Sequence, residues 1–148
     1  LVAEMSPSFP HSALDLGDRI KPLPSDGSIP FMKEWRWIHT PGHTEGHISL
    51  YREKDRTLIV GDAFTTTKQE SLMSVMRQSK DFNGPPAYLT TDWDAAEKSV
   101  KNLEKLKPKL IVPSHGLPIG GEEISTQLQE LSKNFESRAV PDKGKFVK

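Results

Sequence analysis

The chain has 148 residues, enough for one ordinary domain, and its 20 Lys and Arg residues balance 20 Asp and Glu residues. Nothing in this charge balance favours nucleic acid or an anionic membrane surface as a partner. The absence of cysteine excludes disulfides, thiolate zinc sites and a cysteine nucleophile, so His, Asp and Glu are left to hold any transition metal. We expect a cytoplasmic protein, because no apolar run reaches the roughly 18 residues of a membrane-spanning helix and no export signal is recognisable.

Residues 1–34 are expected to be mostly irregular. They contain five prolines together with Gly17 and Gly27, a density that interrupts helices. Only a short extended piece, such as residues 20–23, fits between these positions. We therefore assign 1–34 to a proline-rich loop with one edge strand.

From Trp35 onward the pattern becomes that of β-strands. Trp35 and Trp37, and then Ile48 and Leu50, alternate with polar neighbours, while residues 58–60 form a short apolar run. The charged segment that precedes this run has the length of a hairpin connection, although it lacks an Asn-Gly pair. These features predict three strands, with the last two joined as a hairpin.

Helices and strands alternate in the second half of the sequence. A short helix is predicted around residues 72–76, and apolar residues at spacings of three and four predict a longer one from Trp93 to Leu106, capped by Thr91. Residues 110–112 favour a buried strand, and residues 120–140 a final amphipathic helix. This alternation indicates the α/β class, with helices covering a sheet.

Three residues suited to metal chemistry follow predicted strands. In the histidine-rich segment 39–47, a Pro-Gly pair forms a tight turn that projects His43 from the sheet edge. Asp62 and His115 each follow an apolar strand, and ligands of α/β sheets gather beyond the carboxyl ends of strands. Taken singly, each has an ordinary interpretation, since loop histidines often only donate hydrogen bonds and Asp after Gly often forms a turn. Together, His43, Asp62 and His115 predict a metal site.

The order and spacing of these segments closely resemble the second half of metallo-β-lactamase superfamily hydrolases, including the glyoxalase II-like and lactonase-like branches. The matching segments are Thr40-Pro41-Gly42-His43-Thr44 with Gly46-His47, then Gly61-Asp62, then Ser114-His115-Gly116. The resemblance implies an αββα sandwich in which residues 1–148 are the C-terminal half and 35–116 the metal-ligand core. It also implies that His43 binds one zinc ion, that Asp62 bridges two ions and is catalytic, and that His115 binds the second.

The activity that the resemblance implies is zinc-dependent hydrolysis of an ester, thioester, lactone or amide by a metal-bound hydroxide. His47 and His39 are expected to orient a ligand through their other ring nitrogen. Substrate contacts are expected from the loops, with Lys68 meeting a carboxylate of a small-molecule substrate and Tyr88 a developing oxyanion.

One hallmark of the family is missing from this sequence. The upstream His-x-His-x-Asp-His segment, which supplies further ligands to both ions, has no counterpart, and the only earlier histidine, His11, does not match it. Because the sequence starts at Leu1, we expect it to be a piece of a longer protein whose N-terminal half, or else a second copy of the chain, covers an open sheet face. The chain offers at most two ligands to either ion, so we expect it to be inactive alone.

Two alternatives from other classes stay open. His43, Asp62 and His115 also make the two-histidine, one-carboxylate set of mononuclear iron oxygenases. A non-catalytic module that keeps the fold and binds a partner through its open sheet face is the other alternative.

Overall fold

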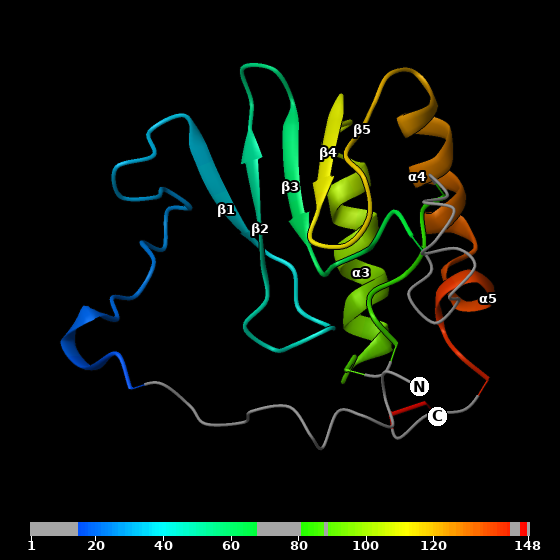
Figure 1. Ribbon diagram of the computed structural model, residues 1–148, viewed down its shortest axis with the longest axis horizontal. Helices are drawn as coiled ribbons and strands as arrows, with labels where there is room; N and C mark the ends of the chain where they lie inside the picture. Colours follow the sequence, from blue (N-terminus) through cyan, green and yellow to red (C-terminus); the bar gives the residue numbers. More distant parts are fainter. Residues whose placement is uncertain (1–14, 68–80, 88, 143–145, 148) are drawn as a thin grey trace.

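The structure, a computed structural model, describes residues 15–67, 81–87, 89–142 and 146–147. A mixed sheet forms its centre, with the strands in the order β1-β2-β3-β4-β5 (Figure 1). Antiparallel pairing joins β1 (Trp35–His39), β2 (Ile48–Arg52) and β3 (Thr57–Gly61), whereas β4 (Leu110–Pro113) runs parallel to β3 and β5 (Ile119–Gly120) antiparallel to β4. The predicted α/β class and mixed sheet are confirmed.

The predicted hairpin joins β2 and β3, and side chains close its turn in place of an Asn-Gly pair. Arg56 has a positive φ of 55° and donates its backbone N–H to the carbonyl of Glu53. The Asp55 carboxylate accepts from the Thr57 amide and from the Arg52 guanidinium. An aspartate side chain that accepts from the backbone amide two residues later stabilises a turn. Asp55 therefore does part of what an Asn-Gly pair would do in this hairpin.

Among the residues that the structure describes, three helices follow the hairpin, and two details differ from the prediction. Helix α3 (Trp93–Glu104) is capped by Asp92, whose carboxylate accepts from Ala95, and not by Thr91. In place of one helix over 120–140, the chain forms α4 (Glu123–Lys133) and α5 (Phe135–Ala139), interrupted at Asn134. The apolar periodicity continues across Asn134, which is why the sequence concealed the break.

The helices pack on one face of the sheet. In Figure 1, α3 lies behind β4, and α4 packs against α3 and β5. Tyr51, Leu58, Val60 and Ile111 supply the sheet side of this core and are almost inaccessible to solvent. The helices contribute the apolar stripes predicted from their spacing, namely Trp93, Ala96, Val100 and Leu103 from α3, and Ile124, Leu128 and Leu131 from α4. The core therefore lies entirely on the helix side of the sheet.

The opposite sheet face carries a row of half-buried apolar residues that we call the outer row. Trp37 pairs with Leu50, Leu50 with Ile59, and Ile59 with Val112, so the four side chains cross four strands in register. Side chains alternate between faces along a strand, which places this row opposite the helices. Within the described residues, no helix packs on this face.

The edge strand predicted within residues 1–34 is wrong at residues 20–23, which are irregular. The described part of this segment has one short 3-10 helix, η2 (Gly17–Arg19), and touches the sheet edge through an isolated bridge from Ser28 to Arg36. The helix predicted at 72–76 lies outside the described residues. Among the helices that the structure describes, none is long and apolar enough to cross a membrane.

Neighbouring residues of β3 test which face is covered. Leu58 is fully buried on the helix side, so Leu58→Ala should lower the free energy of unfolding by about 2–5 kcal/mol. Ile59 is only half-buried in the outer row, so Ile59→Ala should cost on the order of 1 kcal/mol in this chain. Urea unfolding measures the free energy of unfolding of both variants. Equal losses of stability in the two variants would contradict a core on one side of the sheet only.

Candidate metal centre

Three sequence-distant loops bring the predicted ligands together at one end of the sheet. His43 lies in the connection between β1 and β2, Asp62 directly follows β3, and His115 lies two residues after Pro113, the last residue of β4. His43 Nε2 is 3.6 Å from Asp62 Oδ2, and His115 Nε2 is 3.4 Å from Asp62 Oδ1. The structure thus places one imidazole nitrogen beside each oxygen of the Asp62 carboxylate.

Both separations exceed the ordinary hydrogen-bond distance, and both fit a shared ion. Two ligands that each lie 2.0–2.1 Å from a tetrahedral zinc ion stand roughly 3.3 Å apart, close to both N–O distances in this site. Because an imidazole lies beside each of its oxygens, the Asp62 carboxylate would be able to help hold two ions, one with His43 and one with His115. Nitrogen and carboxylate donors of this kind are ordinary zinc ligands, so the residues present fit such an ion.

The described residues nevertheless do not close a complete site. No three His, Cys, Asp or Glu side chains within them gather tightly enough to form a metal-binding cluster. The predicted ligands form two pairs, His43 with Asp62 and His115 with Asp62. The count of at most two ligands for each ion stays a prediction, as does ligation by His43, Asp62 and His115.

The turn that carries His43 is fixed against the start of α3. Gly42 has a φ of 137°, and a Cβ there would lie 2.4 Å from the backbone of Ala96. The Gly42 carbonyl accepts from the amides of both Thr91 and Asp92. Position 42 therefore requires glycine for its backbone conformation and for the close approach of α3.

His43 is buried, with 7% of its surface exposed, whereas the side chain of His115 is 45% exposed. Burial lowers the pKa of His43 below its ordinary value, against the opposing effect of the Asp62 carboxylate. The neutral imidazole is the form that binds a metal ion. His43 is therefore held in the protonation state that ligation requires.

His47 contacts the backbone of Asp62 and not the side chain of a predicted ligand. Its Nε2 accepts the Asp62 N–H at 2.9 Å, so Nδ1 carries the ring proton and donates toward Thr40. A Cβ on Gly61 would lie 2.6 Å from His47 Nε2, so glycine leaves room for the ring. His47 therefore positions Asp62 through its amide, and burial favours the neutral ring by lowering its pKa.

A directed chain of hydrogen bonds continues from His47 into the sheet. The Val60 carbonyl can only accept, so Ser49 donates to it at 3.0 Å and in turn accepts from Thr40 at 3.0 Å. Thr40 then accepts from His47 Nδ1 at 2.9 Å. The Nδ1 proton is also shared with the Thr40 carbonyl at 3.1 Å, and the chain links the Asp62 amide to the Val60 carbonyl.

His39 lies apart from this chain of bonds. It is exposed, and its Nε2 donates to the carbonyl of Glu45 at 2.7 Å, because a carbonyl oxygen cannot donate. This contact ties the β1–β2 connection to itself and does not reach Asp62 or His43. The structure thus gives His39, at the end of β1, a local contact with the β1–β2 connection, and its expected role in orienting a ligand stays a prediction.

Two residues to which the sequence analysis assigned no role, Ser114 and Thr66, hold the other side of the site. Ser114 donates to Asp62 Oδ1 at 2.5 Å. The Thr66 amide donates to the His115 carbonyl at 3.2 Å, and its hydroxyl donates to the Leu117 carbonyl at 2.8 Å. Serine and threonine are common in loops, so only the three consecutive threonines after Asp62 could have drawn attention to this segment.

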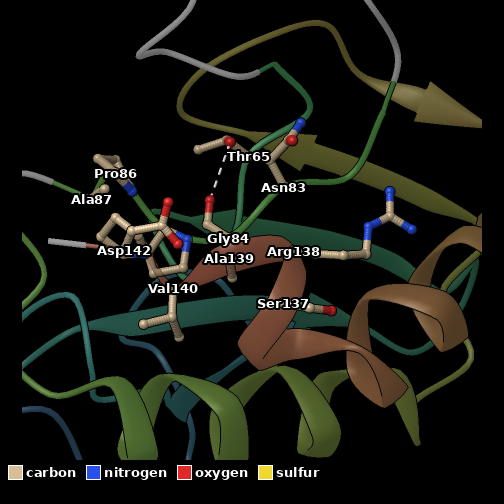
Figure 2. Close-up of a pocket in the computed structure, with 12 residues that line it drawn as sticks. Thr65, Asn83, Gly84, Pro86, Ala87, Ser137, Arg138, Ala139, Val140 and Asp142 are labelled. Carbon is tan, nitrogen blue, oxygen red and sulfur yellow. Dashed lines mark hydrogen bonds between the residues drawn. The ribbon is translucent and has the colours of Figure 1, made fainter. Parts of the chain in front are cut away.

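The expected substrate contacts Lys68 and Tyr88 lie outside the described residues. A cavity of about 350 Å³ borders the loop that follows Asp62, and its walls include Thr65, Gly84, Pro86 and Asp142. Figure 2 shows Thr65 bound to the Gly84 carbonyl across this wall. None of the predicted metal ligands lines the cavity, so it is separate from the candidate site.

Hydrogen exchange at the Asp62 amide tests the role of His47. His47→Ala removes the acceptor, so this amide should exchange about 2–10-fold faster, as the loss of one ordinary hydrogen bond predicts. His39→Ala is the matched control, because it removes a ring from the end of β1, just before the same connection, and His39 has no contact with Asp62. An unchanged Asp62 exchange rate in His47→Ala, measured by NMR, would contradict the assignment.

A family model and curated relatives of known sequence point to the same family for this chain. Residues 3–115 match the family model described as "Metallo-beta-lactamase superfamily". The probable metallo-hydrolase YflN of Bacillus subtilis is 44% identical over 137 residues, which cover 93% of this chain and 52% of the relative. A second Bacillus subtilis protein, the probable metallo-hydrolase YybB, is 36% identical over 103 residues, or 70% of this chain and 39% of the relative.

The chain thus spans about half the length, or less, of these curated relatives. Among solved structures, the BLEG-1 B3 metallo-beta-lactamase matches with a TM-score of 0.51 at 22% identity, over 71% of this chain and 46% of that one. At this identity the likeness concerns the fold alone. The extent of the family match and the identity to its relatives show that the chain belongs to the metallo-beta-lactamase superfamily.

Proposed function

We propose that this chain supplies part of the active site of a metal-dependent hydrolase with two zinc ions. The observation that carries the proposal is the pairing of His43 and His115 with opposite oxygens of the Asp62 carboxylate. The relatives YflN and YybB bear the name of probable metallo-hydrolases, which supports the same reaction class. In this assignment His43 holds one ion, His115 the other, and Asp62 both.

Zinc bound there would act as a Lewis acid and lower the pKa of a coordinated water to about 7. The side chains of this chain orient and hold the site. Ser114 fixes one oxygen of Asp62, and His47 fixes the backbone of the same residue. The 45% exposure of the His115 side chain and the 28% exposure of the Asp62 side chain leave this edge open to a small molecule.

The proposed substrate class is an ester, thioester, lactone or amide, whose carbonyl carbon is the point of attack. Lys68 and Tyr88 remain proposed substrate contacts, for a carboxylate and for a developing oxyanion. His43, Asp62 and His115 would also suit an iron oxygenase as two histidines and one carboxylate. Metal analysis of the complete gene product separates the two reactions, since zinc without oxygen uptake supports hydrolysis and iron with oxygen uptake supports the oxygenase.

Replacement of the shared carboxylate is the direct test of the hydrolase. In the zinc-loaded complete gene product, Asp62→Ala should lower kcat/KM for thioesters or lactones by more than about 100-fold, because even outer contacts of a metal site cost 10–100-fold. Asp55→Ala is the matched control, since Asp55 is an exposed carboxylate bound to Arg52 at the far end of β3. Equal rates for the wild type and Asp62→Ala would remove Asp62 from the mechanism.

Residues 1–148 tested alone should show negligible hydrolysis, since two ligands for each ion bind weakly and activate water poorly. Zinc-dependent turnover by these residues alone, measured on the same substrates, would show that other side chains complete the site.

We further propose that a second apolar sheet covers the outer row, supplied by the part of the complete protein that corresponds to the rest of its relatives. The support is the continuous row Trp37, Leu50, Ile59 and Val112, together with the share of the relatives' length that this chain spans. Apolar surface of this continuity is seldom left open in a monomer. The same second sheet would bring the ligands that this chain lacks.

Sedimentation of residues 1–148 alone tests the open face. The wild type should self-associate, and Leu50→Asp should reduce the association because it places a charge in the centre of the outer row. Leu89→Asp is the control, since Leu89 is a 52% exposed leucine outside the sheet. A monodisperse monomer for the wild type would contradict the proposal.

A further inference from the structure

The buried hydroxyl of Thr90 lies between the ring of His43 and a backbone carbonyl. Thr90 is 1% exposed, and its Oγ1 is 3.2 Å from His43 Nδ1 and 2.9 Å from the carbonyl oxygen of Pro86. A hydroxyl has one proton, and a carbonyl oxygen has none to give. Both contacts are hydrogen bonds at once in one arrangement only, in which Thr90 donates to Pro86 and accepts from His43.

We infer that Thr90 is a positioning residue that selects the Nδ1–H tautomer of His43 and leaves Nε2 free to bind a metal ion. This inference rests on the proposed function, because it assigns Nε2 to the zinc ion. The opposite tautomer would place a proton on Nε2, which lies 3.6 Å from Asp62 Oδ2, too far for a hydrogen bond of useful strength. It would also break the contact between Thr90 and Pro86.

The surroundings of Thr90 hold its hydroxyl in place. The next two residues, Thr91 and Asp92, donate their amides to the Gly42 carbonyl, and Asp92 then caps α3. Three consecutive residues therefore bind both the ring of His43 and the backbone of the turn before it. Because α3 is anchored in the core, Thr90 keeps a fixed position relative to the sheet.

Ser99 provides a matched comparison within the same structure. It is also buried, at 3% exposed, and its hydroxyl donates to the Pro41 carbonyl at 2.7 Å. Ser99 thus holds the backbone of the same turn without contacting the ring of His43. Substitution of Ser99 therefore weakens the turn before His43 and leaves the ring contact, whereas substitution of Thr90 removes the ring contact.

The test is the tautomer of His43 in the metal-free complete gene product, read from long-range ¹H–¹⁵N NMR correlations of the ring. Wild type, Thr90→Ser and Ser99→Ala should show Nδ1–H, whereas Thr90→Val should show a mixture or Nε2–H. In zinc titrations, Thr90→Val should weaken binding about 10–100-fold, and Thr90→Ser should restore affinity to within about threefold of wild type.

An Nε2–H ring in the wild type would overturn the inference, as would a Thr90→Val variant with unchanged tautomer and zinc affinity. If Thr90→Val does not fold, the wild-type spectrum alone decides, because the inference requires Nδ1–H there. Failure of the proposed function is distinguishable. In that case the tautomers follow the expected pattern while zinc neither binds nor supports hydrolysis.

Discussion

The hydrogen bond from the Asp62 amide to the His47 ring is the contact on which the candidate site depends. It joins the end of β3 to the β1–β2 connection, the two segments that carry Asp62 and His43. Buried Thr40 and Ser49 extend it to the Val60 carbonyl, so the polar groups at this end of the sheet satisfy one another. A buried network satisfied in this way fixes one arrangement, because any other leaves a polar group without a partner.

Much of the fold was readable from the sequence because apolar spacing reflects burial directly. The strands at Trp35, Ile48 and residues 57–61, and the helix from Trp93, follow such spacing, and the structure contains each of them. The break at Asn134 and the short strand β5 were missed, since neither interrupts the apolar pattern. Helix capping was misassigned by one residue because Thr91 and Asp92 are both good caps.

For the site, the sequence identified the residues that the structure brings to Asp62, but not the contacts that hold them. Histidine and aspartate after a strand are informative because few residue types bind metals. The residue types of Thr66, Thr90 and Ser114 carry no such signal. Their partners lie 47 to 52 residues away, except for Pro86, which is four residues before Thr90. The three clustered histidines make three different kinds of contact: His43 lies beside the Asp62 carboxylate, His47 accepts from the Asp62 amide, and His39 donates to the Glu45 carbonyl. Spacing along the sequence does not show in which direction each ring points.

The close contact between Gly42 and Ala96 links the loop of His43 to α3 at the level of sequence change. A larger residue at either position would push the turn away from the helix, and with it the ring that Thr90 holds. A change of sequence in segment 40–47 should therefore be accompanied by a matching change in segment 90–96. An engineer who transplants the histidine loop from a relative into this scaffold needs to move the start of α3 with it.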